Sequence, residues 1–341
     1  MREFTRLANK VVQVVTACLL VCLLTSQSVI AESQDPEQAS KPAQAALDQA
    51  KSLAESKRQD EAIAVCNKAL ALLDTSSERG RIDRARLLER VAIVYAMQEK
   101  FEKAEIAAVE AKTILEKLVA PSHFGLSVVR STLAQILISQ CKYSEASLLI
   151  DLTLSNLTKK DDVQTRDSSL IRRQKNLLIA EWYRLKYYVQ INTDREALAV
   201  DSIRSAIKIL DQESDPRLKG EKLECQNDLA AVLIELAKFK EAERISKEVM
   251  LSSEGTWTSD SMNKGITIGC LATIYYRQGR YSEALPLAYK VLDIAEKQNG
   301  KEHLAVAEVL DKIGDIFLKL NRHAEAVPYL ERSSAIRKKF L

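Results

Sequence analysis

The sequence predicts an all-α protein, a right-handed α-solenoid of about seven antiparallel helical hairpins, and two observations predict it. The first is a small residue that recurs about every 42 residues, which is the spacing of a structural repeat. These residues, the ladder alanines, are Ala62, Ala104, Ala146, Ala242, Ala284 and Ala326. The second is the scarcity of Gly and Pro, 9 and 6 residues in 341, which favours long helices. Each repeat would then bury its apolar face against its neighbours alone.

The N-terminus has the order and length of a secretory signal, residues 1–31. Arg2, Arg6 and Lys10 precede an apolar run over 11–24, and small or modest side chains at 29–31 place cleavage near Ala31. A retained N-terminal anchor is the alternative, but an anchor needs roughly 20 apolar residues. We therefore expect an exported protein, periplasmic or extracellular, without stable membrane insertion after cleavage.

The polar, proline-containing residues 32–42 are expected to form a flexible linker, and helical hairpins are expected from Ala43 onward. Twelve residues before each ladder alanine stands a second small residue, and nine before it stands a bulky one. Such a small pair lets two antiparallel helices approach closely. Gly279 and Asn321 suit a left-handed end to a first helix. Ser144 and the pair Thr193-Asp194 offer N-cap oxygens for a second helix.

The last repeat carries the clearest family pattern, with Ile313-Gly314, Phe317 and Ala324-Glu325-Ala326-Val327-Pro328-Tyr329-Leu330. This pattern resembles the tetratricopeptide repeat family, and the period of about 42 is similar to the kinesin-light-chain type. The resemblance covers residues 43–341. It implies a non-catalytic scaffold for protein–protein interaction that binds a peptide or a helix in a concave groove.

The fourth repeat, near 158–212, is irregular. Leu185 stands where a small partner of Ala197 is expected, and Ala199 with Ala206 offers a register shifted by two residues. The sequence leaves both registers open.

In this family the first helix of each hairpin lines the groove, so the resemblance places ligand-binding side chains there. Arg86 and Arg90 are four residues apart, and their guanidinium groups could share one anionic group. An ordinary hydrated surface is the alternative. The predicted groove residues are Arg86, Arg90, Gln135, Ser139, Asn227, Thr273, Tyr276, Arg277 and Asp315.

Aromatic residues gather in the irregular repeat at Trp182, Tyr183, Tyr187 and Tyr188. Core packing and a partner-binding patch formed by Trp182, Tyr183 and Tyr187 are the two interpretations, because such side chains fill cores and also anchor interfaces.

The sequence contains no motif for catalysis, and we expect neither an enzyme nor a bound metal or cofactor. His123 and His303 occupy the same repeat position, which favours a role in a turn. Among the four cysteines outside the signal, only Cys225 and Cys270 belong to adjacent repeats and could pair. The near balance of 50 Lys and Arg with 47 Asp and Glu gives no reason to expect nucleic acid as a partner.

Self-association is the second functional interpretation. The last repeat ends at Phe340 and Leu341 without a polar capping helix behind it. Because solenoids normally need polar caps, an apolar end could stack on another copy and produce a homo-oligomer.

Overall fold

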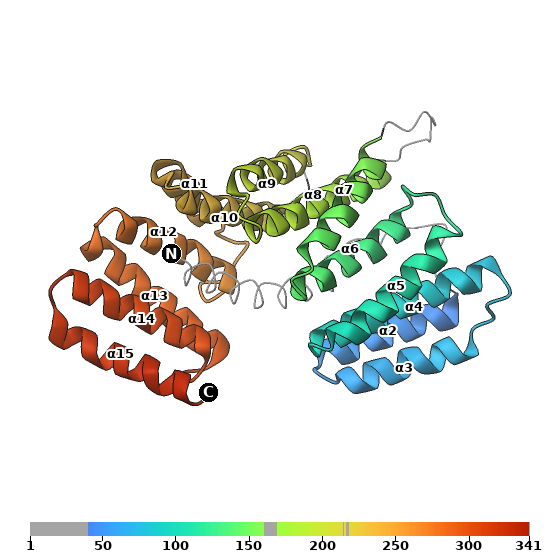
Figure 1. Ribbon diagram of the computed structural model, residues 1–341, viewed down its shortest axis with the longest axis horizontal. Helices are drawn as coiled ribbons and strands as arrows, with labels where there is room; N and C mark the ends of the chain where they lie inside the picture. The colour runs from blue at the N-terminus through green and yellow to red at the C-terminus, as the bar shows by residue number, and fades with distance from the viewer. Residues whose placement is uncertain (1–39, 160–168, 214, 216–217, 341) are drawn as a thin grey trace. The chain divides into compact units, whose positions relative to one another are not determined.

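The computed structural model describes residues 40–159, 169–213, 215 and 218–340, and within these every regular element is a helix (Figure 1). The all-α class and the repeated hairpins are therefore confirmed. The predicted signal and most of the linker lie outside the described residues. The helices are α2 Lys41–Glu55, α3 Gln59–Leu72, α4 Glu78–Met97, α5 Phe101–Glu116, α6 Phe124–Ser139, α7 Tyr143–Thr158, α8 Ser169–Ile191, α9 Glu196–Leu210, α10 Lys219–Glu235, α11 Phe239–Ser252, α12 Met262–Arg277, α13 Tyr281–Asn299, α14 Leu304–Lys319 and α15 His323–Lys338.

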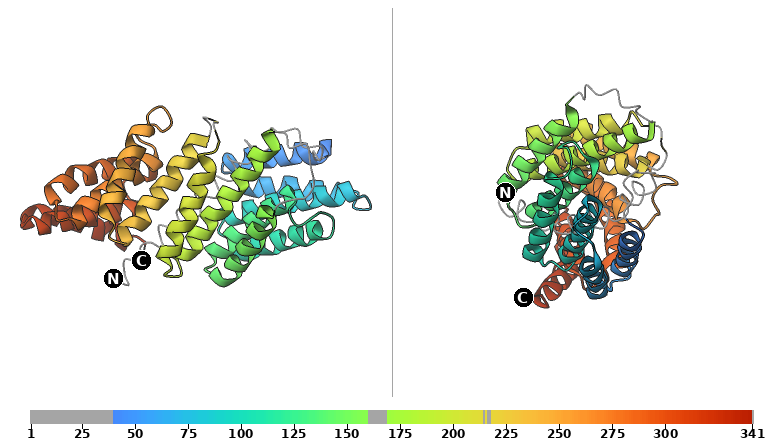
Figure 2. Two further views of the ribbon diagram at one scale, coloured as in Figure 1. Left: turned by 90° about the horizontal axis from the view of Figure 1, so that it is seen from above. Right: turned by 90° about the vertical axis from the view of Figure 1, so that its right-hand side faces the viewer.

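The chain divides into two compact units, Met1–Asp194 and Arg195–Leu341. In unit 1, the hairpins α2/α3, α4/α5 and α6/α7 stack side by side and α8 packs on α6 and α7 (Figure 2). In unit 2, α9 packs on α10, and the hairpins α10/α11, α12/α13 and α14/α15 follow. The division falls inside the irregular fourth repeat, between its first helix and its second. None of the helices in the described ranges has the length and hydropathy needed to cross a bilayer.

The ladder alanines and their small partners mark the crossings of the hairpin helices. All six ladder alanines are buried, and so are Ala92, Ala134 and Gly314 on the first helices. At the last crossing a Cβ added to Gly314 would lie 2.5 Å from Cδ2 of Leu330. The backbones therefore approach closely because the side chains between them are small.

The turn inside each repeat has one conformation. The residue before the second helix's N-cap has a positive φ in all seven repeats: Lys57, Glu99, Cys141, Asp194, Ala237, Gly279 and Asn321. The N-cap that follows is always Lys or Arg, as at Arg280, whose amide donates to the carbonyl of Tyr275 at 2.8 Å. This pattern closes the first helix as a Schellman turn. The prediction of left-handed Gly279 and Asn321 is confirmed.

The predicted N-cap oxygens are wrong. Lys142 and Arg195 occupy the N-cap positions of α7 and α9, and neither helix has a side-chain cap. Ser144 lies inside α7, and Asp194 supplies the left-handed residue of its turn. The backbone hydrogen bonds of the Schellman turn position the second helix, and no side-chain oxygen is needed to cap it.

His123 and His303 are the N-cap residues of the first helices α6 and α14, in agreement with the turn role that their shared repeat position predicted. Nδ1 of His123 accepts from the amide of Gly125 at 3.1 Å, and Nδ1 of His303 accepts from the amide of Ala305 at 3.1 Å. Each histidine therefore satisfies an orphan amide at a helix N-terminus, as Ser and Asp do elsewhere.

The register of the fourth repeat follows Ala199. Ala199 and Ala206 are buried whereas Ala197 is exposed, and Ala199 stands four residues after the basic N-cap Arg195. Every other ladder alanine also stands four residues after its N-cap. The register shifted by two residues is correct, and the one that pairs Leu185 with Ala197 is wrong.

The C-terminal hairpin exposes some apolar surface but is not uniformly apolar. Val327 and Phe340 are exposed, while Leu341 lies outside the described residues. Leu292 and Ala295 of α13 pack toward α14. The equivalent positions one repeat later, on α15, are occupied by the polar residues Ser334 and Arg337. These two polar side chains reduce the apolar area available for stacking.

Candidate functional site

Successive first helices touch one another, and this arrangement creates a shared surface on each unit. In unit 1, α2 touches α4, α4 touches α6 and α6 touches α8; in unit 2, α10 touches α12 (Figure 1). We call the surface along these contacts the inner face. Because rigid helices supply it, its side chains are held in place before any ligand arrives.

Polar side chains join the first helices of unit 1. Thr132 Oγ1 of α6 donates to Glu89 Oε1 of α4 at 3.0 Å. On the other side of α6, Ser131 Oγ donates to Glu181 Oε1 of α8 at 2.5 Å, and Gln135 Nε2 lies 3.5 Å from the same oxygen. Four of these five side chains are buried, Glu181 being the exception, so the network fixes how three helices pack.

The groove residues predicted in unit 1 are less accessible than expected. Arg90 and Gln135 are buried, so the expectation that they face solvent is wrong. Arg86 is partly exposed and lies 3.9 Å from Asp83, whose other oxygen accepts from the Ser40 amide at 3.0 Å. The two arginines therefore do not form a joint anion site, because only Arg86 reaches solvent.

The aromatic cluster belongs to the core of unit 1. Trp182 and Tyr187 are buried, and Tyr187 packs edge-on against Tyr188 with ring centroids 5.1 Å apart. The interpretation of Trp182 and Tyr187 as a partner patch is wrong, since neither side chain is accessible. Tyr183 alone among the three keeps partial exposure.

Unit 2 repeats the polar joint between first helices. Asn263 of α12 donates to Glu224 of α10 at 2.8 Å, and Thr267 donates to Asn227 Oδ1 at 2.9 Å. Asn227 in turn donates to the carbonyl of Asn263 at 3.3 Å. Asn227 is therefore buried in the α10–α12 contact, and its predicted exposure is wrong.

The remaining predicted residues of unit 2 come together at the C-terminal ends of α12 and α14. The Tyr276 hydroxyl donates to Asp315 of α14, and Arg277 lies 3.8 Å from Glu235 at the end of α10. Thr273 lies one turn before Arg277 and donates to the carbonyl of Gly269 at 2.8 Å. We call this group the Tyr276 cluster: Glu235, Thr273, Tyr276, Arg277 and Asp315.

The Tyr276 cluster combines fixed donors, acceptors and an aromatic ring that solvent partly reaches. Burial, and then the hydrogen bond to Asp315, hold the pKa of Tyr276 well above its ordinary value, so its hydroxyl remains a donor. Its ring packs edge-on against Tyr281 at 5.5 Å. Arg277 and Leu318 of α14 are exposed. Such a group suits the backbone and side chains of an extended peptide.

Sequence reasoning missed the acidic partners in these contacts, Glu89, Glu181, Glu224 and Glu235. The signal for them is that a polar residue on one first helix faces a polar residue about one repeat later, as Glu224 and Asn263 do.

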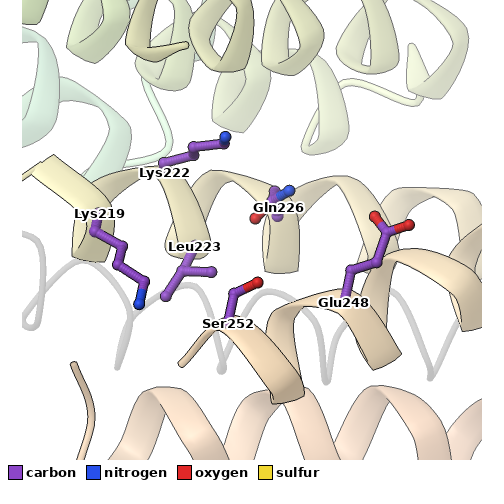
Figure 3. A pocket seen from close by; sticks show the side chains of 6 residues that line it. All are labelled: Lys219, Lys222, Leu223, Gln226, Glu248 and Ser252. Carbon is purple, nitrogen blue, oxygen red and sulfur yellow. The ribbon is translucent and has the colours of Figure 1, made fainter. Parts of the chain in front are cut away.

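A cavity of about 300 Å³ also lies in unit 2, between α10 and α11 (Figure 3). Leu223 contributes apolar surface, and Lys222 is already paired with Asp211. Its lining residues are Lys219, Lys222, Leu223, Gln226, Glu248 and Ser252. Charges of both signs surround it, so its chemistry does not favour one class of ligand. Among the described residues, no three metal-ligating side chains come together.

The comparisons agree with the hairpin architecture. Residues 265–339, most of α12 to α15, match the tetratricopeptide repeat model. This segment contains the Thr273, Tyr276, Arg277 and Asp315 side chains of the Tyr276 cluster. No curated protein matches the chain.

Three solved structures illustrate the similarity of fold. The apo form of RapI is 12% identical with a TM-score of 0.61, covering 87% of this chain and 98% of RapI. BtubC (BKLC) from P. vanneervenii is 16% identical with a TM-score of 0.53, covering 78% of this chain and 93% of that one. The Rap conjugation gene regulator of plasmid pLS20, solved with the Phr* peptide, is 12% identical with a TM-score of 0.54. The match covers 85% of this chain and 72% of the regulator. At these identities the likeness shows the fold alone.

Proposed function

We propose that the protein is a non-catalytic interaction scaffold that binds an extended peptide of a partner protein on the inner face of unit 2. The observation that carries the proposal is the Tyr276 cluster, whose polar groups lie on adjacent first helices. The peptide-bound state of the Rap regulator of pLS20 supports it as an example of a similar fold that binds a peptide.

The chemistry of the cluster suggests what it recognises. Arg277 would pair with a carboxylate or a backbone carbonyl of the peptide, and Asp315 would accept from a backbone amide. The ring of Tyr276 and the exposed Leu318 would contact an apolar side chain. The ordering cost is small because Asp315 already holds the Tyr276 hydroxyl.

Selection from a random peptide library displayed on phage tests this proposal. Selected peptides are expected to bind wild type and to lose at least about tenfold in affinity with Tyr276→Ala, Arg277→Ala or Asp315→Ala. Arg244→Ala is the matched control, because Arg244 is an exposed arginine on the second helix α11. Peptides that bind all four variants equally, or a failure to select any peptide, would contradict the proposal.

We also propose that the protein is exported and that its signal is removed near Ala31. The support is the order of basic, apolar and small residues over 1–31. Cell fractionation with N-terminal sequencing would find a chain beginning at Glu32 outside the cytoplasm. A chain that keeps Met1 in the membrane fraction would support the retained anchor, and a cytoplasmic chain would contradict export.

Self-association is the second candidate function, favoured by the exposed side chains of Val327 and Phe340 on the last hairpin. Light scattering over a range of concentrations separates the two. A dimer or larger species that Val327→Glu returns to monomer would support assembly. A strict monomer at high concentration would reject it.

A further inference from the structure

We infer that the outward surface of α5 and α7 in unit 1 docks an amphipathic helix of a partner whose apolar stripe is flanked by basic residues. The surface is an apolar patch formed by Ile106, Val109, Leu148 and Leu152, here called the α5–α7 patch. It is formed by second helices of unit 1, whereas the Tyr276 cluster is formed by first helices of unit 2, so the two proposals rest on different residues.

All four side chains of the patch are exposed. Ile106 keeps 69% of its surface accessible and Leu148 keeps 73%, while Val109 keeps 39% and Leu152 keeps 51%. Residues 106 and 109 share one face of α5, and residues 148 and 152 share one face of α7. Two aliphatic side chains thus project from each helix, and unit 1 itself covers neither pair.

The repeat provides an internal comparison. Ile106 and Leu148 stand two residues after their ladder alanines. At the same position the second helices of unit 2 carry Asp201, Arg244, Pro286 and Pro328. The hairpin therefore folds without an aliphatic residue there. Because exposed aliphatic surface contributes little to stability, four such side chains on the second helices of two successive repeats indicate an interaction surface.

An ion pair holds the two helices of the patch together. Lys142 Nζ, at the start of α7, lies 2.7 Å from Glu105 Oε2 on α5. Glu105 directly precedes Ile106, and Leu148 lies within two turns of Lys142. The ion pair therefore brings the start of α7 beside the part of α5 that carries Ile106.

The charge around the patch indicates which partner fits. Glu102 lies one turn before Ile106 on α5, and Glu145 lies one turn before Leu148 on α7, both exposed. The other four acidic side chains of the two helices are already paired with basic ones, Glu105 with Lys142, Glu110 with Arg84, Glu116 with Arg130 and Asp151 with Lys186. Glu102 and Glu145 are therefore the acidic groups beside the patch that a partner can engage. A second copy docked by two-fold symmetry would oppose carboxylate to carboxylate, and an anionic lipid surface would be repelled. A helix with Lys or Arg beside its apolar stripe complements both features.

The probe for this inference is a synthetic helical peptide with Leu at i, i+3, i+4 and i+7 and Lys on both sides of that stripe. Fluorescence anisotropy measures its affinity for the full chain. We expect Ile106→Ser/Leu148→Ser to weaken binding at least about tenfold. Leu251→Ser is the matched control, because Leu251 is 74% exposed on second helix α11 of unit 2. It should leave the affinity unchanged.

Two further comparisons separate this docking from non-specific adhesion. A peptide of the same composition in shuffled order should bind at least about tenfold more weakly. Glu102→Gln/Glu145→Gln should weaken binding and flatten its dependence on salt. The inference is overturned if wild type does not bind the probe, if the shuffled peptide binds as well, or if Leu251→Ser weakens binding as much as the double substitution. Self-association that Ile106→Ser/Leu148→Ser abolishes would also overturn it, in favour of a second copy.

Discussion

The guanidinium of Arg280 lies 3.9 Å from the ring centroid of Tyr275 and donates to both carboxylate oxygens of Glu283, at 2.7 and 2.6 Å. One side chain thus joins the last turn of α12 to the first turn of α13. Arg322 makes the same arrangement one repeat later, 4.7 Å from the ring centroid of Phe317 and bonded to Glu325. In the last two repeats, the basic N-cap of the second helix therefore also fastens the turn.

Removing this arginine should cost more where it covers an aromatic ring. Arg280 and Arg58 both bond a glutamate three residues later, but the residue five before Arg58 is Leu53. Because the cation–π contact and the contacts of Arg280 with Gln278 and Glu243 add to the ion pair, we expect Arg280→Ala to raise hydrogen exchange in its turn more than Arg58→Ala does in its own. Equal effects, or the reverse order, would show that the ring contributes nothing.

Replacing Gly314 by the alanine found at this position in every other repeat but the fourth, which has Tyr187, should destabilise unit 2. The new Cβ would lie 2.5 Å from Leu330 Cδ2 and 2.7 Å from its Cγ. Overpacking of this kind costs about 1–3 kcal/mol, although alanine is the better helix former. Urea denaturation of Gly314→Ala measures the loss. Gly314→Ala/Leu330→Ala recreates the Ala272 and Ala288 combination of the preceding repeat and should relieve the clash, so its loss should be smaller than the sum of the losses of the two single variants. A loss equal to that sum or greater would contradict this.

The register of the fourth repeat can be tested with two matched substitutions. Ala199→Leu places a large side chain at a buried crossing and should cost about 1–3 kcal/mol. Ala197→Leu lies on an exposed face of the same helix and should stay within about 0.5 kcal/mol of wild type. Thermal and urea denaturation distinguish them. If Ala197→Leu is the more damaging variant, the register assigned here is wrong.

The cysteines should react in an order set by burial. Cys141 is exposed, whereas Cys66, Cys225 and Cys270 are buried thiols, and Cys225 is not bridged to Cys270. Burial raises the pKa of Cys66 to about 11 and that of Cys270 to about 12. At pH 8 the thiolate fraction of Cys66 is therefore at least about a hundredfold below that of an ordinary cysteine. Alkylation followed by mass spectrometry should label Cys141 in the folded protein and the buried thiols only after unfolding.

The raised pKa values of Cys66 and Cys270 also predict how the stability of the fold changes with pH. The folded protein holds protons on Cys66 and Cys270 more tightly than the unfolded chain does. Their contribution to the free energy of unfolding is therefore complete below about pH 8.5, the ordinary pKa of a cysteine. It falls as the pH rises toward 11 and 12, their pKa values in the folded protein. Cys66→Ala/Cys270→Ala should reduce this alkaline loss in urea titrations. An unchanged pH dependence would assign the loss to other groups.

The fold was largely predictable because it depends on local periodicity. Small residues at a fixed interval, and turn residues such as Gly279 and Asn321, identify the hairpins without knowledge of any distant contact. In every repeat the sequence has a Lys or Arg four positions before the buried alanine, as Arg322 stands before Ala326. It would have assigned Ala199 to the fourth repeat, because the N-cap of every second helix is Lys or Arg.

The candidate site was predictable only in part. The periodicity correctly assigned Asn227, Gln135 and Tyr276 to first helices. It could not say which of them a neighbouring repeat covers, because Thr267 and Glu181, which contact Asn227 and Gln135, lie about one repeat later. Tyr276 remains partly accessible even though Asp315 holds its hydroxyl.

The sequence by itself determined the class of fold, the hairpin and the turn, since these depend on residues within about one repeat of each other. Tertiary structure alone decided which polar side chains join first helices and which face solvent, and it divided the chain at Asp194 and Arg195. The physical reason is that burial depends on what packs against a side chain. Arg90 is buried and Ile106 is exposed, the reverse of what their polarity suggests, because neighbouring helices cover the first and leave the second open.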